Sequence, residues 1–420
     1  MPELLGDWLV RLEQRTPESR IQLGLERVQT MLERLPSARP RVPIITVGGT
    51  NGKGSVVAML EAIYRAAGYR TLAYTSPHLL KFTERVRIDG NSVDEARMVE
   101  ALEKVEHQRQ GLDLTYFEHV TLAALWLAGQ VAPGVVLLEV GLGGRLDAVN
   151  AVDPDVAIIT SIGLDHMEWL GHSRRAIGRE KAGIARPGRP LIVGEARPPA
   201  GWIEEIERRG VRLCAAGREF EWRYEEGRLI LQTSGHVTTL PRPALHGHYQ
   251  GGNAAVACMA ARALAESLPV TAADLAKGLR TVSLPGRLQK LSGPPEVWLD
   301  VGHNPDAASA LACALGDDPR PTTAVFAALT GKDVQAIAQP LSTNFDRWLV
   351  PELEGHRARP AAEIAAILRG LPVTGSVETV ESVHMAVRHA LEAAESRARI
   401  VVFGSFQTVA EAWPVIPQQE

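Results

Sequence analysis

The sequence predicts an α/β protein in which a large domain with a mostly parallel sheet precedes a smaller domain of the same kind. Short runs rich in Val, Ile and Leu alternate with helical patterns, which is typical of a parallel sheet covered by helices on both faces. A glycine-rich loop, GGTNGKGS at 48–55, follows the first run. The stretch SLPGRLQKLSGPPE, rich in Gly and Pro, marks a boundary beyond which the alternation restarts.

The large domain is expected to contain a βαβ unit at its start. Apolar residues between the first two runs recur at helical spacing, and Gly68 supplies a helix stop. Residues 211–240 change to short strand-like pieces, and HGHYQGGNAAVACMAARALAESL then predicts a loop that runs into a long helix. Its strands are expected at 43–47, 70–75, 134–140, 155–162 and 189–194.

The small domain repeats the alternation of strands and helices. We place the two domains at 1–290 and 291–420. Strands of the second are expected at 296–302, 322–329, 347–353 and 398–405.

Composition excludes several classes of partner. The chain has 420 residues and a net charge of only −4, so no basic field indicates nucleic acid and no polybasic segment indicates a membrane surface. The N-terminus does not resemble a secretion signal, and no apolar run is long enough to span a bilayer. Cys214, Cys258 and Cys313 lack metal-type spacing and are interpreted as buried thiols. We therefore expect a cytoplasmic protein without nucleic-acid or membrane partners.

The loop GGTNGKGS suits a polyphosphate. Its glycines allow backbone amides to point inward, the following helix directs its positive end at the same place, and Lys53 adds a full charge. The usual nucleotide loop has Gly where Val47 stands and Ser or Thr, which holds Mg²⁺, where Gly54 stands. The alternative is a plain tight turn between strand and helix.

Residues that follow the other strands supply candidate metal ligands. Ligands bind beyond the carboxyl ends of strands in such sheets. Ser76, Glu139 and His166 follow three of the expected strands, and together they could bind Mg²⁺. Taken one at a time, each has a structural explanation: Ser76 as a turn residue, Glu139 as a solvated strand end and His166 as a helix-start residue. A dinucleotide fingerprint in VGLGGRLDA is disfavoured, because Leu146 stands where its third Gly belongs.

Lys181, in REKAGI, is an unusual neighbour for a metal. It follows His166 on a helical segment, and an ammonium near Mg²⁺ would be repelled. Either Lys181 points to solvent, or it is used as something other than a free amine.

Taken together, these motifs resemble the folylpolyglutamate synthase and dihydrofolate synthase family, within the ATP-dependent Mur-type ligases. The resemblance covers nearly the whole chain. The motifs, in order, are LGLERV, TVGGTNGKGS, YTSPHLLKFTERVRIDG, LTYFE, LLEVGLGGRLDAVN, TSIGLDHMEWLG, GREKAGI, QGGNAA, LPGRLQ, LDVGHNPDA and VVFGSFQTV.

The resemblance implies a P-loop domain like the Mur ligase central domain, followed by a Rossmann-like domain that contributes to ATP and glutamate binding. It implies Mg²⁺ at two sites, ligated through Ser76, Glu139 and His166. It implies a carbamate on Lys181, and catalytic roles for Lys53, Lys181 and His303. Residues expected to bind ATP are Gly49, Thr50, Asn51, Gly52, Lys53, Gly54, Ser55, Asn253, Arg287 and Asp300.

The resemblance also implies where the pterin end of the substrate binds. Bacterial bifunctional members can carry an Asp where this chain has Gln22, and Gln offers a carbonyl but no charge. Residues expected at this site are Gln22, Leu23, Gly24, Thr115, Tyr116, Phe117, Glu118, Leu146, Asp147 and Ala148.

Members of this family phosphorylate a substrate carboxylate with ATP, and L-glutamate then displaces phosphate to form an amide. The leading hypothesis is therefore a bifunctional, monomeric ligase that adds glutamate to dihydropteroate and to folates. Gln22 keeps open a folylpolyglutamate synthase without the first activity. Less favoured are a Mur-type ligase acting on a UDP-muramoyl peptide and a nucleotide switch without ligase activity.

Overall fold

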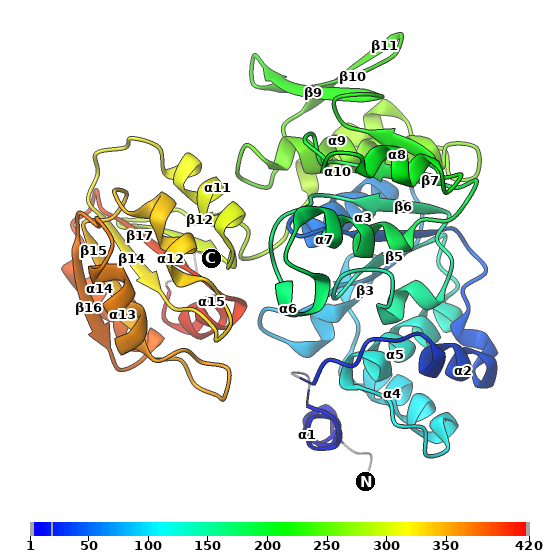
Figure 1. The fold of residues 1–420 in the computed structure, drawn as a ribbon, viewed down its shortest axis with the longest axis horizontal. Coiled ribbons are helices and arrows are strands. Elements are labelled where there is room, and N and C mark those ends of the chain that lie inside the picture. The colour runs from blue at the N-terminus through cyan, green and yellow to red at the C-terminus, as the bar shows by residue number, and fades with distance from the viewer. Residues whose placement is uncertain (1–3, 18–19, 417–420) are drawn as a thin grey trace. The chain divides into compact units, whose positions relative to one another are not determined.

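The computed structural model describes residues 4–17 and 20–416, which form two compact units (Figure 1). The larger unit extends to Ala244 and resumes over Gly251–Val282, whereas the smaller takes Leu245–Gln250 and the chain from Ser283 onward. The chain therefore passes between the units at 244/245, 250/251 and 282/283. Residues 283–290 belong to the smaller unit, ahead of the predicted boundary, since Gln289 and Lys290 pair with its sheet.

The larger unit is built on an eight-stranded sheet with the order β4-β3-β2-β5-β1-β6-β7-β8. The six neighbouring strands β2, β5, β1, β6, β7 and β8 pair in parallel, while the pairs β2–β3 and β3–β4 at one edge are antiparallel, which confirms the predicted mostly parallel sheet. β1 and β5 are buried along their whole length, as expected for continuously apolar strands. The strands are β1 Ile44–Gly48, β2 Thr71–Tyr74, β3 Val86–Ile88, β4 Asn91–Ser92, β5 Val135–Glu139, β6 Val156–Ile159, β7 Pro190–Val193 and β8 Arg212–Ala215.

Helices of the larger unit include α3, which follows β1 directly after the glycine-rich loop. Gly278 lets α10 approach α3 closely, since a Cβ at Gly278 would lie 2.6 Å from the backbone nitrogen of Ile63. The α-helices are α1 Leu5–Arg15, α2 Glu26–Arg34, α3 Lys53–Ala66, α4 Glu95–Arg109, α5 Tyr116–Val131, α6 Met167–Leu170, α7 Arg174–Lys181, α8 Trp202–Glu207, α9 Gln250–Ala263 and α10 Ala272–Thr281. Short 3₁₀ helices cover Pro36–Ala38, Phe82–Arg85, Ala148–Ala151 and Ala182–Ile184.

The strand-like pieces predicted within 211–240 form β8 and a separate three-stranded antiparallel sheet, labelled β9 to β11 in Figure 1. Trp222 of β9 packs on the start of α9, where a Cβ added at Gly252 would lie only 3.3 Å from its indole ring. The strands are β9 Phe220–Glu225, β10 Arg228–Thr233 and β11 His236–Pro241.

The smaller unit has a six-stranded sheet with the order β12-β13-β17-β14-β15-β16, parallel except for β12. The aromatic rings of Phe326, Phe345, Trp348 and Phe403 form the centre of its core. Its strands are β12 Gln289–Leu291, β13 Glu296–Asp300, β14 Thr322–Phe326, β15 Arg347–Pro351, β16 Ser376–Val380 and β17 Arg399–Phe403. Its helices are α11 Pro305–Leu315, α12 Val334–Ala338, α13 Ala361–Arg369, α14 Val383–Ala393 and α15 Phe406–Ala412, with 3₁₀ turns at Gln339–Leu341 and Trp413–Val415.

Within the described ranges, no helix combines the length and the apolar character needed to cross a membrane.

Candidate active site

The glycine-rich loop joins the end of β1 to the start of α3 and is held by the residues that follow β6. The amide of Thr50 donates to the carbonyl of Ser161 at 2.9 Å, and the amide of Asn51 donates to the Ser161 hydroxyl at 2.9 Å. In return, the amide of Gly163 donates to the Thr50 hydroxyl at 2.9 Å. The loop is therefore fixed from both sides before any ligand arrives.

Two glycines in this loop are required by their surroundings. Gly49 has φ of 146°, and a Cβ there would collide with the Thr160 hydroxyl. Gly52 has φ of 87° and caps α3, and a Cβ there would lie 2.5 Å from the side-chain oxygen of Asn253. The structure thus brings Asn253, on α9, against the loop, as its predicted role requires.

Lys53 begins α3 and curls back over the loop. Its ammonium donates to the carbonyls of Gly49 at 3.1 Å and Thr50 at 3.2 Å. Gly54 and Ser55 follow in the first turn of α3, where Ser55 is buried. Loop amides, the start of a helix and a lysine are therefore grouped in the way that phosphate binding needs.

The structure brings two of the three predicted metal ligands into direct contact. Glu139 ends β5, is only 6% exposed, and accepts a hydrogen bond from the amide of Ser76 at 3.2 Å. His166 lies beyond β6, which β1 separates from β5 in the sheet, and has a left-handed φ of 51°. The amide of His166 donates to the carboxylate of Asp165 at 2.9 Å. Among the described residues, no group of three or more His, Cys, Asp or Glu side chains is arranged to hold a metal ion.

Lys181 ends α7 and is buried, with only 4% of its surface exposed. The alternative in which it points to solvent is therefore wrong. Burial, and to a lesser extent the positive charge of Lys53, lower the pKa of its amine to about 7, while the charge of Asp165 acts in the opposite direction. Lys181 thus lies within electrostatic reach of both the loop lysine and the segment that carries His166.

The predicted pterin-binding segments are joined to one another. The amide of Gly24 donates to the carbonyl of Leu146 at 3.3 Å. Arg27, on α2, pairs with Glu118 at 2.8 Å and also donates to the carbonyl of Gln22 at 2.8 Å. The sequence analysis did not identify Arg27, because no local signal indicates a partner 91 residues away.

Thr115 and the aromatic pair that follows it start α5. Thr115 and Glu118 form a capping box, in which each side chain accepts from the other residue's amide. Tyr116 packs edge-on against Phe82, and Phe117 lies against the loop after β5, where a Cβ on Gly141 would be 2.5 Å from its ring. These contacts place the α5 start beside the loop that contains Leu146.

Asp147 follows Leu146 in the loop after β5 and lies within electrostatic reach of Lys53. It is buried and accepts hydrogen bonds from the amides of Leu142 at 2.8 Å and Val149 at 3.1 Å. Burial raises the pKa of its carboxyl to about 6, although those hydrogen bonds and the nearby charge of Lys53 act in the opposite direction. Ala148 follows at the start of a 3₁₀ turn.

The smaller unit contains the three remaining predicted residues. Asp300 ends β13 and accepts hydrogen bonds from the amides of Leu288 at 2.8 Å and Gly302 at 2.7 Å, and burial raises the pKa of its carboxyl. The guanidinium of Arg287 lies 4.8 Å from the ring centroid of Phe406. A ring nitrogen of His303 lies 3.0 Å from the carbonyl of Val301.

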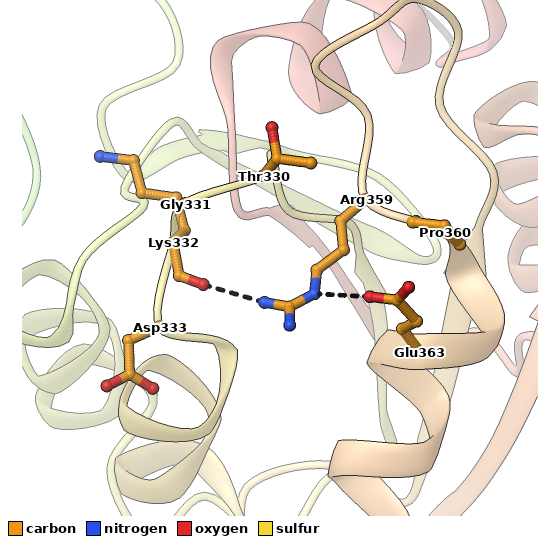
Figure 2. A pocket seen from close by; sticks show the side chains of 7 residues that line it. All are labelled: Thr330, Gly331, Lys332, Asp333, Arg359, Pro360 and Glu363. Atoms are coloured by element: carbon orange, nitrogen blue, oxygen red, sulfur yellow. Dashed lines mark hydrogen bonds and ion pairs between the residues drawn. The ribbon is translucent and has the colours of Figure 1, made fainter.

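An open pocket of about 400 Å³ lies at the carboxyl ends of β14 and β15 in the smaller unit. Figure 2 shows the guanidinium of Arg359 extending across it, donating to the carbonyl of Lys332 at 3.0 Å and to the carboxylate of Glu363 at 3.3 Å. The sequence analysis assigned no role to this pocket. Its lining residues are Thr330, Gly331, Lys332, Asp333, Arg359, Pro360 and Glu363.

Two family models match the chain. Residues 47–261 match the Mur ligase middle domain, and residues 286–406 match the Mur ligase glutamate ligase domain.

Known relatives match over nearly the full length. The chain is 40% identical, over 417 residues, to the dihydrofolate synthase/folylpolyglutamate synthase of Escherichia coli strain K12, which covers 98% of this chain and 95% of that protein. A structure of E. coli FolC in complex with DHPP and ADP superimposes with a TM-score of 0.92 at 39% identity, covering 98% of this chain and 97% of that one. A bifunctional folylpolyglutamate synthase/dihydrofolate synthase with Mn, AMPPNP and L-glutamate bound has a TM-score of 0.90 at 40% identity, and covers 98% of each chain.

Proposed function

The chain belongs to the dihydrofolate synthase/folylpolyglutamate synthase family of Mur ligases, and on that premise we propose that it joins L-glutamate to dihydropteroate and to folates, using ATP. One observation supports this above the others: the loop with Lys53 and the Glu139–Ser76 contact both lie beyond the carboxyl ends of parallel strands. The buried Asp147, next to Leu146 of the predicted pterin site, lies within electrostatic reach of Lys53.

ATP and a divalent cation are the proposed cofactors. The loop amides from Gly49 to Ser55, together with Lys53 and Asn253, suit the phosphates, and in the smaller unit Arg287 and Asp300 stay predicted ATP-binding residues. Ser76, Glu139 and His166 provide the oxygen and nitrogen donors that Mg²⁺ accepts. When bound, Mg²⁺ would screen the repulsion between the substrate carboxylate and the triphosphate.

The proposed reaction has two steps. The substrate carboxylate attacks the γ-phosphorus of ATP, which forms an acyl phosphate and releases ADP. The unprotonated amine of L-glutamate then attacks the acyl carbon, the bond to phosphate breaks, and the nitrogen loses a proton as the amide forms. Lys53 would stabilise the negative charge that moves toward ADP in the first step.

We propose that Lys181 reacts with CO₂ to form a carbamate. Only an unprotonated amine can add to CO₂, and a pKa of about 7 leaves much of the Lys181 amine unprotonated near neutral pH. The amine nitrogen forms a bond to the carbon of CO₂ and loses a proton to solvent, and the anion that results replaces the repulsion between Lys181 and Lys53 by attraction. That change supports a role beside the metal ligands.

The pocket of the smaller unit is the proposed place where L-glutamate is recognised. L-Glutamate carries two carboxylates and one ammonium, so its site needs charges of both signs. Arg359 and Lys332 provide positive charges in this pocket, and Glu363 and Asp333 provide negative charges. We therefore propose this pocket as the part of the second domain that binds L-glutamate.

A two-substrate assay tests the function. Purified protein with ATP, Mg²⁺ and L-glutamate should release ADP with dihydropteroate and with tetrahydrofolate. No release with either would overturn the proposal. Release with tetrahydrofolate alone would support a folylpolyglutamate synthase without the first activity, the alternative that Gln22 keeps open. A monomeric state and a cytoplasmic location remain predictions.

A further inference from the structure

Arg27 connects two of the three predicted pterin segments of the larger unit, those with Gln22 and Glu118. Its Nε lies 3.0 Å from both carboxylate oxygens of Glu118, and its Nη2 lies 2.8 Å from one of them. The same Nη2 donates to the carbonyl of Gln22 at 2.8 Å. One guanidinium therefore holds the N-terminal segment against the start of α5.

Glu118 cannot move independently of this contact. Its side chain is only 4% exposed, and one of its oxygens also accepts the amide of Thr115 at 2.8 Å. A carboxylate buried to this extent needs a charged partner, and Arg27, with 19% of its side chain exposed, is the partner that the structure gives it.

The third segment is attached by the backbone. Gly24 lies between Gln22 and Arg27 in the chain, and its amide donates to the carbonyl of Leu146. Its φ of 151° is one that glycine adopts readily. Fixing Gln22 through Arg27 therefore also limits how Gly24 can meet Leu146.

We propose that Arg27 is a positioning residue for the pterin end of the substrate, setting affinity for that substrate while contributing nothing to the chemical steps. The inference rests on the proposed function. A pterin ring presents several N–H donors, which need acceptors at fixed positions, and the carbonyl groups of the 22–24 segment gain fixed positions only while Arg27 holds them.

The planar fork of arginine is needed here. Its Nε donates to both oxygens of Glu118, while its Nη2 lies near one of these oxygens and also donates to the carbonyl of Gln22. Lysine at this position keeps the charge for Glu118 but has no planar fork to hold both partners together. Arg27→Lys and Arg27→Gln thus separate loss of geometry from loss of charge.

The matched control is Arg34→Gln on the same helix. Arg34 also connects α2 to another part of the larger unit, but within the described ranges its hydrogen bonds go to the carbonyls of Gln108 at 3.4 Å and Arg109 at 2.5 Å, neither of which is a predicted pterin residue. Far-UV circular dichroism and thermal melting confirm that each variant folds.

The measurement is steady-state kinetics of ADP release, with tetrahydrofolate and ATP varied in turn, together with the Kd of tetrahydrofolate by equilibrium dialysis without ATP. We expect Arg27→Gln to raise the KM and Kd for tetrahydrofolate roughly tenfold or more. The kcat and the KM for ATP should stay within about twofold of wild type. Arg27→Lys should recover part of the affinity, and Arg34→Gln should match wild type.

Three outcomes would overturn the inference: an unchanged KM and Kd in Arg27→Gln, a fall in kcat without a change in KM, or an equal loss of affinity in Arg34→Gln. If Arg27→Gln does not fold, Arg27→Lys decides the question by the same criteria. If the wild type releases no ADP with either folate substrate, the proposed function fails. If the wild type is active and Arg27→Gln has the same KM and Kd, only the inference about Arg27 is wrong.

Discussion

The carboxylate of Glu139 accepts a hydrogen bond from the backbone amide of Ser76, 3.2 Å away, so the ends of β5 and β2 are joined at the edge where the phosphate loop lies. This amide orients the carboxylate without adding a positive charge. The proposed role of Glu139 as a ligand of the divalent cation depends on the negative charge of this carboxylate.

Glu139→Gln should test that charge. The amide side chain keeps the size of Glu139 and can still accept from Ser76, but it cannot attract Mg²⁺ as an anion. We expect ADP release to fall by about 100-fold or more, with a raised Mg²⁺ requirement, when measured by titrating Mg²⁺ at saturating ATP. Glu168→Gln, an exposed neighbour on α6, is the control and should leave the titration unchanged. Full activity of Glu139→Gln at low Mg²⁺ would refute the metal assignment.

Lys181 should make activity depend on CO₂. Below pH of about 7 the Lys181 amine is increasingly protonated and cannot form a carbamate; above it the amine is mostly neutral. We therefore expect CO₂-depleted enzyme to lose activity, most strongly near pH 6, and added bicarbonate to restore it. A ¹³C signal of a carbamate from labelled bicarbonate, absent in Lys181→Met, is the direct measurement. Activity that is indifferent to both CO₂ and Lys181→Met would contradict this.

Gln22→Asp should improve the use of dihydropteroate. An Asp side chain at this position would offer a charged acceptor to pterin N–H groups, in a segment whose backbone Arg27 already holds. We expect the KM for dihydropteroate to fall by about three- to tenfold, with little change in the KM for ATP. Gln22→Asn, which adds no charge, is the control. An equal fall in Gln22→Asn would show that side-chain size, and not charge, limits this substrate.

Asp147 should make stability depend on pH. Its pKa is raised on folding from 3.8 to about 6, so its stabilising contribution is complete below pH 3.8 and is lost as the pH rises through about 6. Asp147→Asn cannot ionise, so its free energy of unfolding relative to wild type should increase by about 2–3 kcal/mol between pH 4 and pH 7. Urea unfolding at both pH values measures the difference. If the difference in the free energy of unfolding does not change with pH, the pKa of Asp147 is not raised in the folded state.

The sequence predicts the strands best where they are buried on both faces. The runs at 43–47 and 134–140 correspond closely to β1 and β5, because continuous apolar side chains have no other place in a soluble domain. β16 was not predicted, since it is an edge strand with largely exposed side chains and no apolar run. β3 and β4 are too short to leave a pattern.

The strand-end residues could be predicted because parallel topology alone sends Ser76 and Glu139 to one edge. The burial of Lys181 could not, because periodicity gives the spacing of a helix's residues but not what covers a short helix such as α7. Arg27 and the pocket around Arg359 depend on side chains from distant segments, and one sequence does not show which distant residues pair.

The position of the helix that follows the glycine-rich loop depends on Gly278, a residue far from the loop in the sequence. α10 can lie against Ile63 only because nothing projects from Gly278, and the helix on which Ile63 stands begins with Lys53. Even a methyl group there would have to displace α3 or α10. A substitution at Gly278, remote from the loop in the sequence, would thus require a compensating change in α3 or α10.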